Sequence, residues 1–184
     1  MRIISGTFRG KKLLSPDREG TRPTSDRSKE ALFSILGSYL KSIGKSWADI
    51  TFADVFSGAG AIGLEAYSRG AKEVFFFENH PGAMEIINKN RAALKLPPIG
   101  IQDALIPPKK EQPVDIIFFD APYGKGLWQQ SLEAFFQKGW MSEKTLIVIE
   151  NDSKHEEIVP SGFILKEKRN YGRNQFSLLI LQET

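Results

Sequence analysis

Between residues 51 and 150 the chain alternates short apolar runs with longer stretches of helical periodicity. Repeated strand–helix units of this kind predict an α/β fold, with a mostly parallel sheet and helices on both faces. We expect strands at residues 51–56, 73–78, 99–102, 115–120 and 146–150, and helices at residues 61–69, 81–94 and 127–138. The crossover at residues 104–114 contains three prolines and is expected to be irregular.

The C-terminal part follows a different pattern. Two strand-like runs, residues 163–170 and 175–181, flank a Tyr-Gly-Arg-Asn turn at residues 171–174 and predict an antiparallel hairpin. The hairpin brings the expected sheet to seven strands. We expect residues 46–184 to form the sheet domain and residues 1–45 to form a basic N-terminal extension.

The N-terminal extension is expected to contain one small hairpin and one helix. Residues 2–15 predict a β-hairpin whose turn lies near residues 6–10. Apolar residues at helical spacing follow, so a helix is expected to begin at a Thr24 or Ser25 cap and to end near Gly44.

Composition limits the function classes that are open to this chain. A chain of 184 residues that is 41% hydrophobic and 26% charged can bury an ordinary core. With no cysteine and two histidines, disulfides and thiolate metal sites are excluded, and no metal site is expected. No signal peptide is expected, and no run reaches the roughly 20 apolar residues that cross a bilayer. We therefore expect a cytoplasmic protein with no membrane contact.

Positive charge is concentrated at the N-terminus. The first thirty residues carry eight Lys or Arg and four Asp or Glu, a net charge of +4, whereas the remaining 154 residues carry 17 basic and 18 acidic groups, a net charge of −1. A basic end of this kind indicates contact with a polyanion. A solvated basic tail is the open alternative.

A glycine-rich turn stands between the first expected strand of the sheet and the helix that follows it. Its sequence, GAGAIG at residues 58–63, is the fingerprint of a nucleotide-like cofactor site. Gly58 and Gly60 permit close approach of a ligand, and Gly63 permits the helix to pack on the strand. Glu78 ends the second strand, twenty residues after Gly58, where a carboxylate can accept both ribose hydroxyls.

The glycine turn alone does not separate a nicotinamide or flavin cofactor from S-adenosylmethionine. Asp54 favours the latter, because an acid before the turn can bind the ammonium group of a methionine moiety and repels a pyrophosphate. Its alternative role is to brace nearby backbone amides. The expected cofactor-binding residues are Asp54, Ser57, Gly58, Gly60, Glu78, Asn79, Asp103 and Ala104.

The fourth expected strand stops at Asp120-Ala121-Pro122-Tyr123. A loop with this sequence can bind a planar NH2 group. Asp120 and the Ala121 carbonyl accept its hydrogens while Tyr123 stacks on the attached π-system. Pro122 restricts the backbone of Ala121 and so directs its carbonyl. These four residues are the expected catalytic set, and a plain turn after a strand is the alternative. Together with the glycine turn they indicate transfer of a group from an adenosine-bearing cofactor to an amino nitrogen.

The chain resembles bacterial 16S rRNA guanine-N2 methyltransferases of the RsmD type over nearly its whole length. The resemblance rests on five segments: RIISGTFRG at residues 2–10, TRPTSDR at 21–27, KEALF at 29–33, DVFSGAG at 54–60 and DAPY at 120–123. It implies a Rossmann-like class I methyltransferase that uses S-adenosylmethionine and modifies one guanine of 16S rRNA in a 30S subunit or assembly intermediate. A monomer is expected.

The resemblance also assigns residues to the substrate RNA. It places Arg9, Lys11 and Lys12 on RNA phosphates, and it places three residues at the rim of the cleft, namely Arg22, Pro23 and Thr24. One position departs from the family pattern. Ala121 stands where the family has a proline, so the loop loses one fixed φ angle, and a modest loss of turnover is expected.

Other functions share parts of this pattern. The same loop can bind the planar NH2 group of adenine N6 or of a glutamine side-chain amide. A nicotinamide oxidoreductase shares the glycine turn, and a non-catalytic RNA-binding or assembly factor shares the basic end.

Overall fold

The computed structural model describes residues 1–15, 26–122, 126–154 and 159–182 of the 184-residue chain. Within these ranges no helix combines the length and the apolar character that crossing a bilayer requires. The helices are α1 (Asp26–Ser42), α2 (Ala61–Ser68), α3 (Pro81–Ala93) and α4 (Leu127–Gln137), with a 3-10 turn η1 (Trp47–Asp49). The strands are β1 (Thr51–Val55), β2 (Glu73–Phe77), β3 (Ile101–Gln102), β4 (Ile116–Phe119), β5 (Leu146–Asp152), β6 (Phe163–Tyr171) and β7 (Asn174–Leu181).

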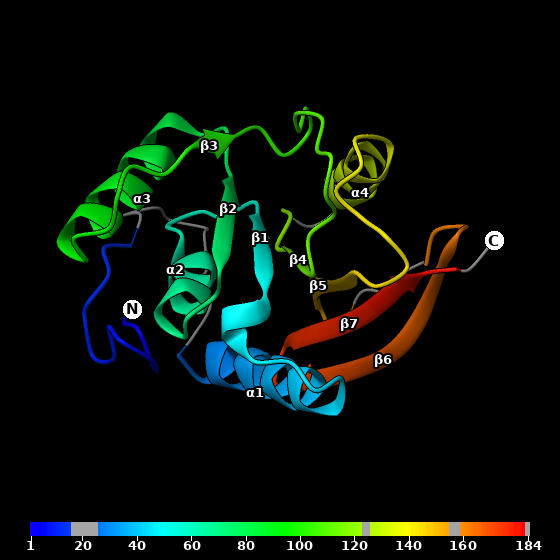
Figure 1. Ribbon diagram of the computed structural model, residues 1–184, viewed down its shortest axis with the longest axis horizontal. Helices are drawn as coiled ribbons and strands as arrows, with labels where there is room; N and C mark the ends of the chain where they lie inside the picture. Colours follow the sequence, from blue (N-terminus) through cyan, green and yellow to red (C-terminus); the bar gives the residue numbers. More distant parts are fainter. Residues whose placement is uncertain (16–25, 123–125, 155–158, 183–184) are drawn as a thin grey trace.

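All of these strands belong to one sheet, in the order β3-β2-β1-β4-β5-β7-β6 (Figure 1). The pairs among β1 to β5 are parallel, and β7 runs antiparallel between β5 and β6. The strand order reverses between β1 and β4, which makes the carboxyl ends of these two strands the switch point where ligands bind in open α/β sheets. The parallel sheet with a C-terminal hairpin that the sequence predicts is confirmed.

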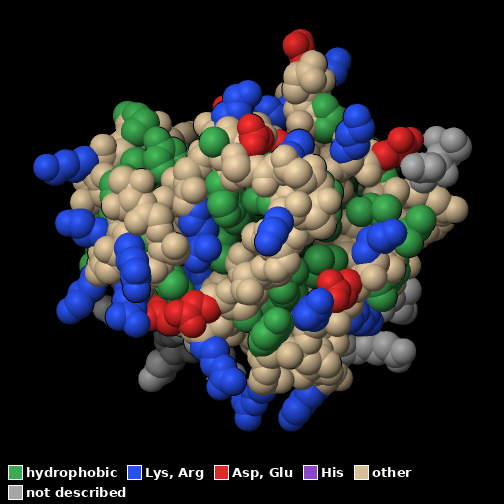
Figure 2. All heavy atoms as spheres, turned by 60° about the horizontal axis from the view of Figure 1, so that its bottom comes forward, with side chains coloured by type: hydrophobic (Ala, Val, Ile, Leu, Met, Phe, Trp, Pro, Cys, Tyr) green, Lys and Arg blue, Asp and Glu red, His purple; other side chains and the backbone are tan. Residues whose placement is uncertain are grey.

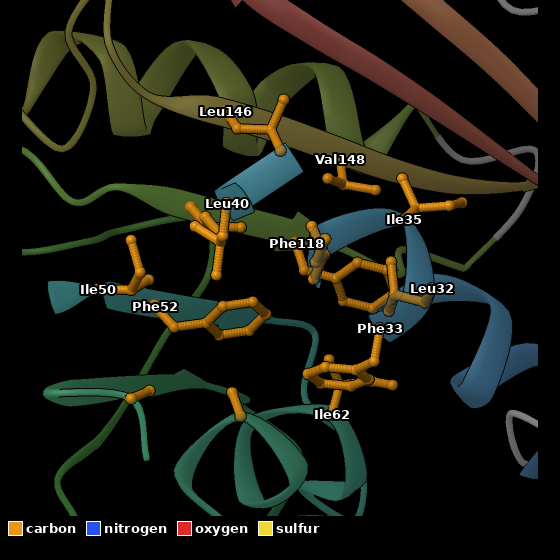
Figure 3. Packing of buried hydrophobic residues seen from close by; sticks show 14 of the residues in the cluster. Leu32, Phe33, Ile35, Leu40, Ile50, Phe52, Ile62, Phe118, Leu146 and Val148 are labelled. Atoms are coloured by element: carbon orange, nitrogen blue, oxygen red, sulfur yellow. The ribbon is translucent and has the colours of Figure 1, made fainter. Parts of the chain in front are cut away.

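The first face of the sheet is covered by α1 and α2. Leu32 and Phe33 of α1 pack with Phe52 of β1 and Phe118 of β4, and Ile62 of α2 closes the cluster (Figure 3). Each of these five side chains is at most 5% exposed. Full burial of one such side chain stabilises a fold by about 1.5–3 kcal/mol, so this cluster is a main contributor to stability.

The opposite face of the sheet is covered by α4. Phe135 of α4 contacts Phe77 of β2 and Phe119 of β4, with ring centroids 4.6 and 5.6 Å apart. Trp140 lies edge-on to Phe77 at 5.0 Å. Because neighbouring residues of a strand point to opposite faces, burial on both sides explains why β4 reads as an unbroken apolar run.

The N-terminal segment, residues 1–15, forms the short antiparallel hairpin expected from its sequence. Arg2 and Lys12 form an antiparallel bridge. Beside it, the Ile3 N–H donates to the Lys11 carbonyl and the Gly10 N–H donates to the Ile3 carbonyl, both at 2.9 Å. The backbone N–H groups of Ile4 and Ser5 donate to the Glu65 carboxylate of α2, at 2.7 and 3.0 Å. The hairpin therefore docks onto α2, because the buried Glu65 carboxylate on that helix accepts two of its backbone N–H groups.

Glu65 also joins α2 to α1. Its carboxylate lies 3.7 Å from the Lys29 ammonium and 2.9 Å from the Arg69 guanidinium. The side chains of Glu65 and Lys29 are fully buried, and Lys29 also donates to the Arg2 carbonyl. Burial lowers the pKa of Lys29, while the charge of Glu65 opposes that shift. Removal of one partner from such a buried pair costs roughly 3–5 kcal/mol, so the pair fixes how the N-terminal segment, α1 and α2 meet.

Gly6 marks the closest approach of the N-terminal segment to α2. A Cβ atom at Gly6 would lie 1.8 Å from the Ser68 carbonyl oxygen, which also accepts the Thr7 N–H at 2.8 Å. Gly10 has nearly the same backbone angle, with φ of 83° against 81°, but a Cβ atom there would meet nothing within 4 Å. A side chain at either glycine would therefore meet the same backbone strain, but only a side chain at Gly6 would also clash with its surroundings.

We expect Gly6→Ala to lower the free energy of unfolding by roughly 1–3 kcal/mol more than Gly10→Ala, because only the former adds a clash to the shared strain at positive φ. Urea denaturation of both variants measures the difference. Limited proteolysis is expected to cut the N-terminal segment faster in Gly6→Ala. Equal stability and equal cleavage of the two variants would show that the segment does not depend on this contact.

Candidate active site

Strand β1 leads into the glycine turn at the carboxyl edge of the sheet. Phe56, Gly58 and Gly60 have φ of 65°, 56° and 76°. Glycine adopts such angles freely, whereas a non-glycine residue there is strained by about 1–3 kcal/mol. Helix α2 begins directly after the turn, so the strand–turn–helix context predicted for the fingerprint is confirmed.

Gly63 allows α2 to lie close against the strands, as predicted. A Cβ atom at Gly63 would lie 2.4 Å from the Phe76 ring and 3.1 Å from Asp54 Oδ2. The backbone N–H of Gly63 donates to the same oxygen at 2.8 Å, and Asp54 is 1% exposed. The structure therefore shows Asp54 in the bracing role that the sequence left open. Its contact with a cofactor ammonium group stays a prediction.

The protonation of Asp54 is set by its burial. Burial raises the pKa of Asp54 to about 7; the Gly63 N–H opposes this shift, and the charges of Asp120 and Glu78 add to it. Asp54, near the end of β1, is therefore within electrostatic reach of Asp120 and Glu78, which follow β4 and β2 directly. This coupling agrees with their positions at the carboxyl ends of neighbouring parallel strands.

Glu78 connects the end of β2 to the glycine turn. One carboxylate oxygen accepts the N–H of Gly58 at 2.9 Å, and the other accepts the N–H groups of Asn79 and His80 at 3.0 and 2.8 Å. The Asn79 amide in turn donates to Asp103 at 3.3 Å, beyond the end of β3. Four of the predicted cofactor-binding residues, Gly58, Glu78, Asn79 and Asp103, thus form one connected row at the carboxyl ends of three strands.

Two further residues predicted to bind the cofactor, Ser57 and Ala104, are buried and make hydrogen bonds that join neighbouring elements. The Ser57 hydroxyl donates to the Asp54 carbonyl at 2.6 Å and accepts the Phe77 N–H at 3.1 Å, which joins β1 to β2. Ala104 is 3% exposed, and its carbonyl accepts the Ser131 hydroxyl of α4 at 2.7 Å. Contact of Ser57 or Ala104 with a cofactor stays a prediction.

Asp120 follows β4 directly at the switch point. Its backbone N–H donates to the Val55 carbonyl at 3.1 Å, so it lies beside the strand that enters the glycine turn. Burial raises the pKa of the Asp120 carboxyl to about 6. Ala121 is 6% exposed and Pro122 is exposed. Tyr123, the fourth residue of the predicted catalytic set, lies outside the described residues.

The basic residues predicted to contact RNA lie on the docked N-terminal segment. Arg9, Lys11 and Lys12 are all exposed. Figure 2 shows Lys and Arg side chains around much of one face of the molecule, with Asp and Glu side chains in small patches between them. The predicted rim residues Arg22, Pro23 and Thr24 lie outside the described residues.

Asn90 is a residue that the sequence reasoning missed. It is 1% exposed on α3, and its amide makes paired hydrogen bonds with the backbone of Leu14, at 2.7 and 3.1 Å. The same amide nitrogen donates to the Ala59 carbonyl in the glycine turn at 3.0 Å. Asparagine has a low helix propensity unless its side chain makes such hydrogen bonds. An asparagine within the expected helix is therefore the sequence feature that could have identified this residue.

The sequence reasoning also missed Glu150, although Glu150, like Asp120, is an acid at the end of an apolar run. It is an acid near the end of β5, a buried apolar strand that pairs with β4. Glu150 is 4% exposed. Burial raises its pKa to about 9, and the charge of Asp120 adds to the shift.

The strand order and the glycine turn at the switch point define a Rossmann-like methyltransferase. Solved structures agree with this class. The chain is similar to yhhF from Escherichia coli, with a TM-score of 0.80 and 30% identity, covering 99% of this chain and 98% of that one. It is also similar to HI0767 from Haemophilus influenzae, with a TM-score of 0.75 and 29% identity over 99% and 98% of the two chains.

The sequence comparisons identify the family. Residues 1–180 match the family described as conserved hypothetical protein 95. Ribosomal RNA small subunit methyltransferase D from Escherichia coli is 31% identical over 182 residues, which cover 97% of this chain and 88% of that protein. The protein of the same name from Haemophilus influenzae is 33% identical over 176 residues, covering 91% and 88%. The chain belongs to this family, and the RsmD-type resemblance of its motifs is confirmed.

Asp54→Asn tests how much the ionisation of this buried carboxyl group lowers the free energy of unfolding. Asparagine keeps an oxygen for the Gly63 N–H but does not ionise. The pKa of Asp54 in the folded protein lies above its ordinary value, so the folded state binds more protons than the unfolded state between about pH 4 and 7. The contribution of Asp54 to the free energy of unfolding therefore falls as pH rises through this window.

We expect the Asn variant to match the wild type near pH 4 and to exceed its free energy of unfolding by roughly 1–4 kcal/mol at pH 8. Urea denaturation at both pH values measures this. An Asn variant that is less stable than the wild type at pH 8 would show that the fold needs the ionised carboxylate.

Proposed function

We propose that this protein is an S-adenosylmethionine-dependent methyltransferase that modifies the exocyclic N2 of one guanine in 16S rRNA. The observation that carries the proposal is the position of Asp120 and Ala121, which leave β4 at the switch point beside the glycine turn. Membership in a family with members named ribosomal RNA small subunit methyltransferase D supports rRNA as the acceptor.

The cofactor would lie along the edges of β1, β2 and β3. The glycine turn would face the methionine moiety, Glu78 the ribose, and Asp103 the adenine. This set fits an adenosine-bearing group, because carboxylates at the ends of β2 and β3 match hydroxyl and amino donors. When bound, S-adenosylmethionine supplies an electrophilic methyl group. Ser57 and Asn79 support the row through the hydrogen bonds that join its neighbours.

The acceptor amino group would be held by Asp120 and the Ala121 carbonyl. The lone pair of an aromatic amine is delocalised into its ring, so hydrogen bonds from both N–H groups favour a more tetrahedral nitrogen. The freed lone pair can then face the methyl group, and catalysis is mainly positioning and electrostatics. Asp120, with a pKa of about 6, is ionised at neutral pH and can accept the proton that the nitrogen loses.

Recognition of the RNA would use both sides of the site. Tyr123 would stack on the base turned out of its helix or loop, with Pro122 fixing the approach of the loop. Exposed Arg9, Lys11 and Lys12 would contact phosphates. We propose a 30S subunit or assembly intermediate as the substrate and a cytoplasmic monomer as the active form.

Adenine N6 and a glutamine side-chain amide are the competing acceptors, because both present a planar NH2 group to the same loop. Tritium transfer from labelled S-adenosylmethionine to 30S subunits that lack their native methylations tests the RNA acceptor. Mass spectrometry of the rRNA nucleosides then identifies the modified atom. N2-methylguanosine supports the proposal, and N6-methyladenosine or label found only in protein rejects it.

Replacement of Asp120 tests its assigned role. We expect Asp120→Ala to lower methyl transfer to rRNA by about 100-fold or more, because both the hydrogen-bond acceptor and the proton acceptor are lost. Cofactor affinity, measured by calorimetry, should stay nearly unchanged. Asp152→Ala makes the same change at an acid that ends the neighbouring strand β5; it is the matched control and should retain activity. Undiminished transfer by Asp120→Ala would reject the role.

Charge reversal tests the N-terminal RNA surface. We expect Lys11→Glu with Lys12→Glu to weaken binding to rRNA and to reduce the slope of log affinity against log salt by about 1.4–1.8, because two phosphate contacts are lost. Filter binding at several salt concentrations measures the slope. The control pair, Lys138→Glu with Lys144→Glu, makes the same charge change at exposed positions outside this surface. Equal effects of the two pairs would indicate a non-specific response to net charge.

A further inference from the structure

Glu150 lies on the strand next to the one that carries Asp120. Strands β4 and β5 are parallel, and Phe119 pairs with Ile149 in their register. The next residues along the two strands are Asp120 and Glu150, so their carboxyl groups lie at the same edge of the sheet. Glu150 is 4% exposed, which leaves its carboxyl almost without contact to bulk water.

The two oxygens of the Glu150 carboxyl have different surroundings. Oε1 accepts the Asn174 amide at 2.6 Å, and the same amide nitrogen lies 3.0 Å from the Ser28 hydroxyl of α1. Oε2 is buried and finds no hydrogen-bond partner among the described residues. Because Asn174 occupies Oε1 as a donor, a proton on this carboxyl belongs on Oε2.

The charges around Glu150 favour its neutral form. No cation contacts its carboxyl among the described residues, and of its neighbours Asp120, Asn174 and Ser28 only Asp120 titrates. Two carboxylates that share a poorly hydrated site do not both ionise readily, because each raises the cost of the other's charge. Burial and the charge of Asp120 accordingly raise the pKa of Glu150 to about 9.

We propose that Glu150 is a positioning residue that keeps its proton, so that Asp120 alone carries negative charge where the acceptor amino group binds. The inference rests on the proposed function and goes beyond it in assigning the charge state of a second carboxyl. An ionised Glu150 would instead favour protonation of Asp120, and a protonated Asp120 could not accept a further proton. The neutral Glu150 therefore preserves the acceptor.

The proton balance of the reaction follows from this assignment. As the N–C bond to the methyl group forms and the S–C bond breaks, the nitrogen loses one proton to Asp120. Glu150 retains its own proton throughout, so the pair changes from one bound proton to two. Release of the proton from Asp120 to solvent restores the starting state.

Carbon-13 labelling of glutamate carboxyls tests the charge state directly by NMR titration, without any substrate. We expect one glutamate carboxyl to remain protonated at pH 8 in the wild type, and its signal to be absent in Glu150→Gln. The signal should persist in Glu143→Gln, an exposed control. In Asp120→Asn its titration midpoint should move to lower pH, because the neighbouring negative charge is gone. No protonated glutamate at pH 8, or a midpoint unchanged by Asp120→Asn, would overturn the proposal.

Methyl transfer by Glu150→Gln provides the second readout. Glutamine is neutral and keeps an oxygen for Asn174, so kcat should stay within about threefold of the wild type. A loss of about 100-fold in kcat with unchanged KM would indicate an ionised catalytic base and would overturn the proposal. If the wild type transfers no methyl group to rRNA, the proposed function fails, while the NMR titration still decides the charge state of Glu150.

Discussion

Three neighbouring parallel strands place the carboxyl groups of Asp54, Asp120 and Glu150 at one edge of the sheet, where Asp54 and Glu150 are buried and Asp120 is partly buried. The parallel order of β1, β4 and β5 makes this convergence unavoidable, since their carboxyl ends point the same way. Burial raises the pKa of each group, and their mutual repulsion adds to the shift for Asp54 and Glu150. An arrangement that costs folding free energy in this way is expected where a site is organised for chemistry rather than for stability.

Hydrogen-bond donors offset part of the folding free energy that these carboxyl groups cost. The Gly63 N–H binds Asp54, and the Asn174 amide binds Glu150. These contacts come from α2 and β7, on opposite sides of the switch point. The acidic edge therefore depends on the correct packing of elements that lie far from one another in the chain, and it is formed only when the whole domain is folded.

The N-terminal segment is joined to the rest of the fold both by apolar packing of Ile3 and Leu13 and by buried polar contacts. Glu65 holds the start of the segment and Asn90 holds its end, while Asn90 also binds the glycine turn. The hairpin was predicted but its docking onto α2 was not, because periodicity along residues 2–15 does not reveal an acceptor on a helix sixty residues away. The extension of β5 to Asp152 has a similar origin, since β7 supplies a strand partner for that residue.

The sequence by itself determined the order of strands and helices, the glycine turn and the position of the Asp-Ala-Pro-Tyr loop. These features are written in local periodicity, in residues with special backbone freedom and in short motifs. Only the tertiary structure decided that Asp54 binds a backbone amide, that Glu65 binds the backbone of the N-terminal segment and that Glu150 is buried on the strand beside that of Asp120. Each of these depends on which groups lose water when distant elements pack together, and burial of that kind is a property of the whole fold.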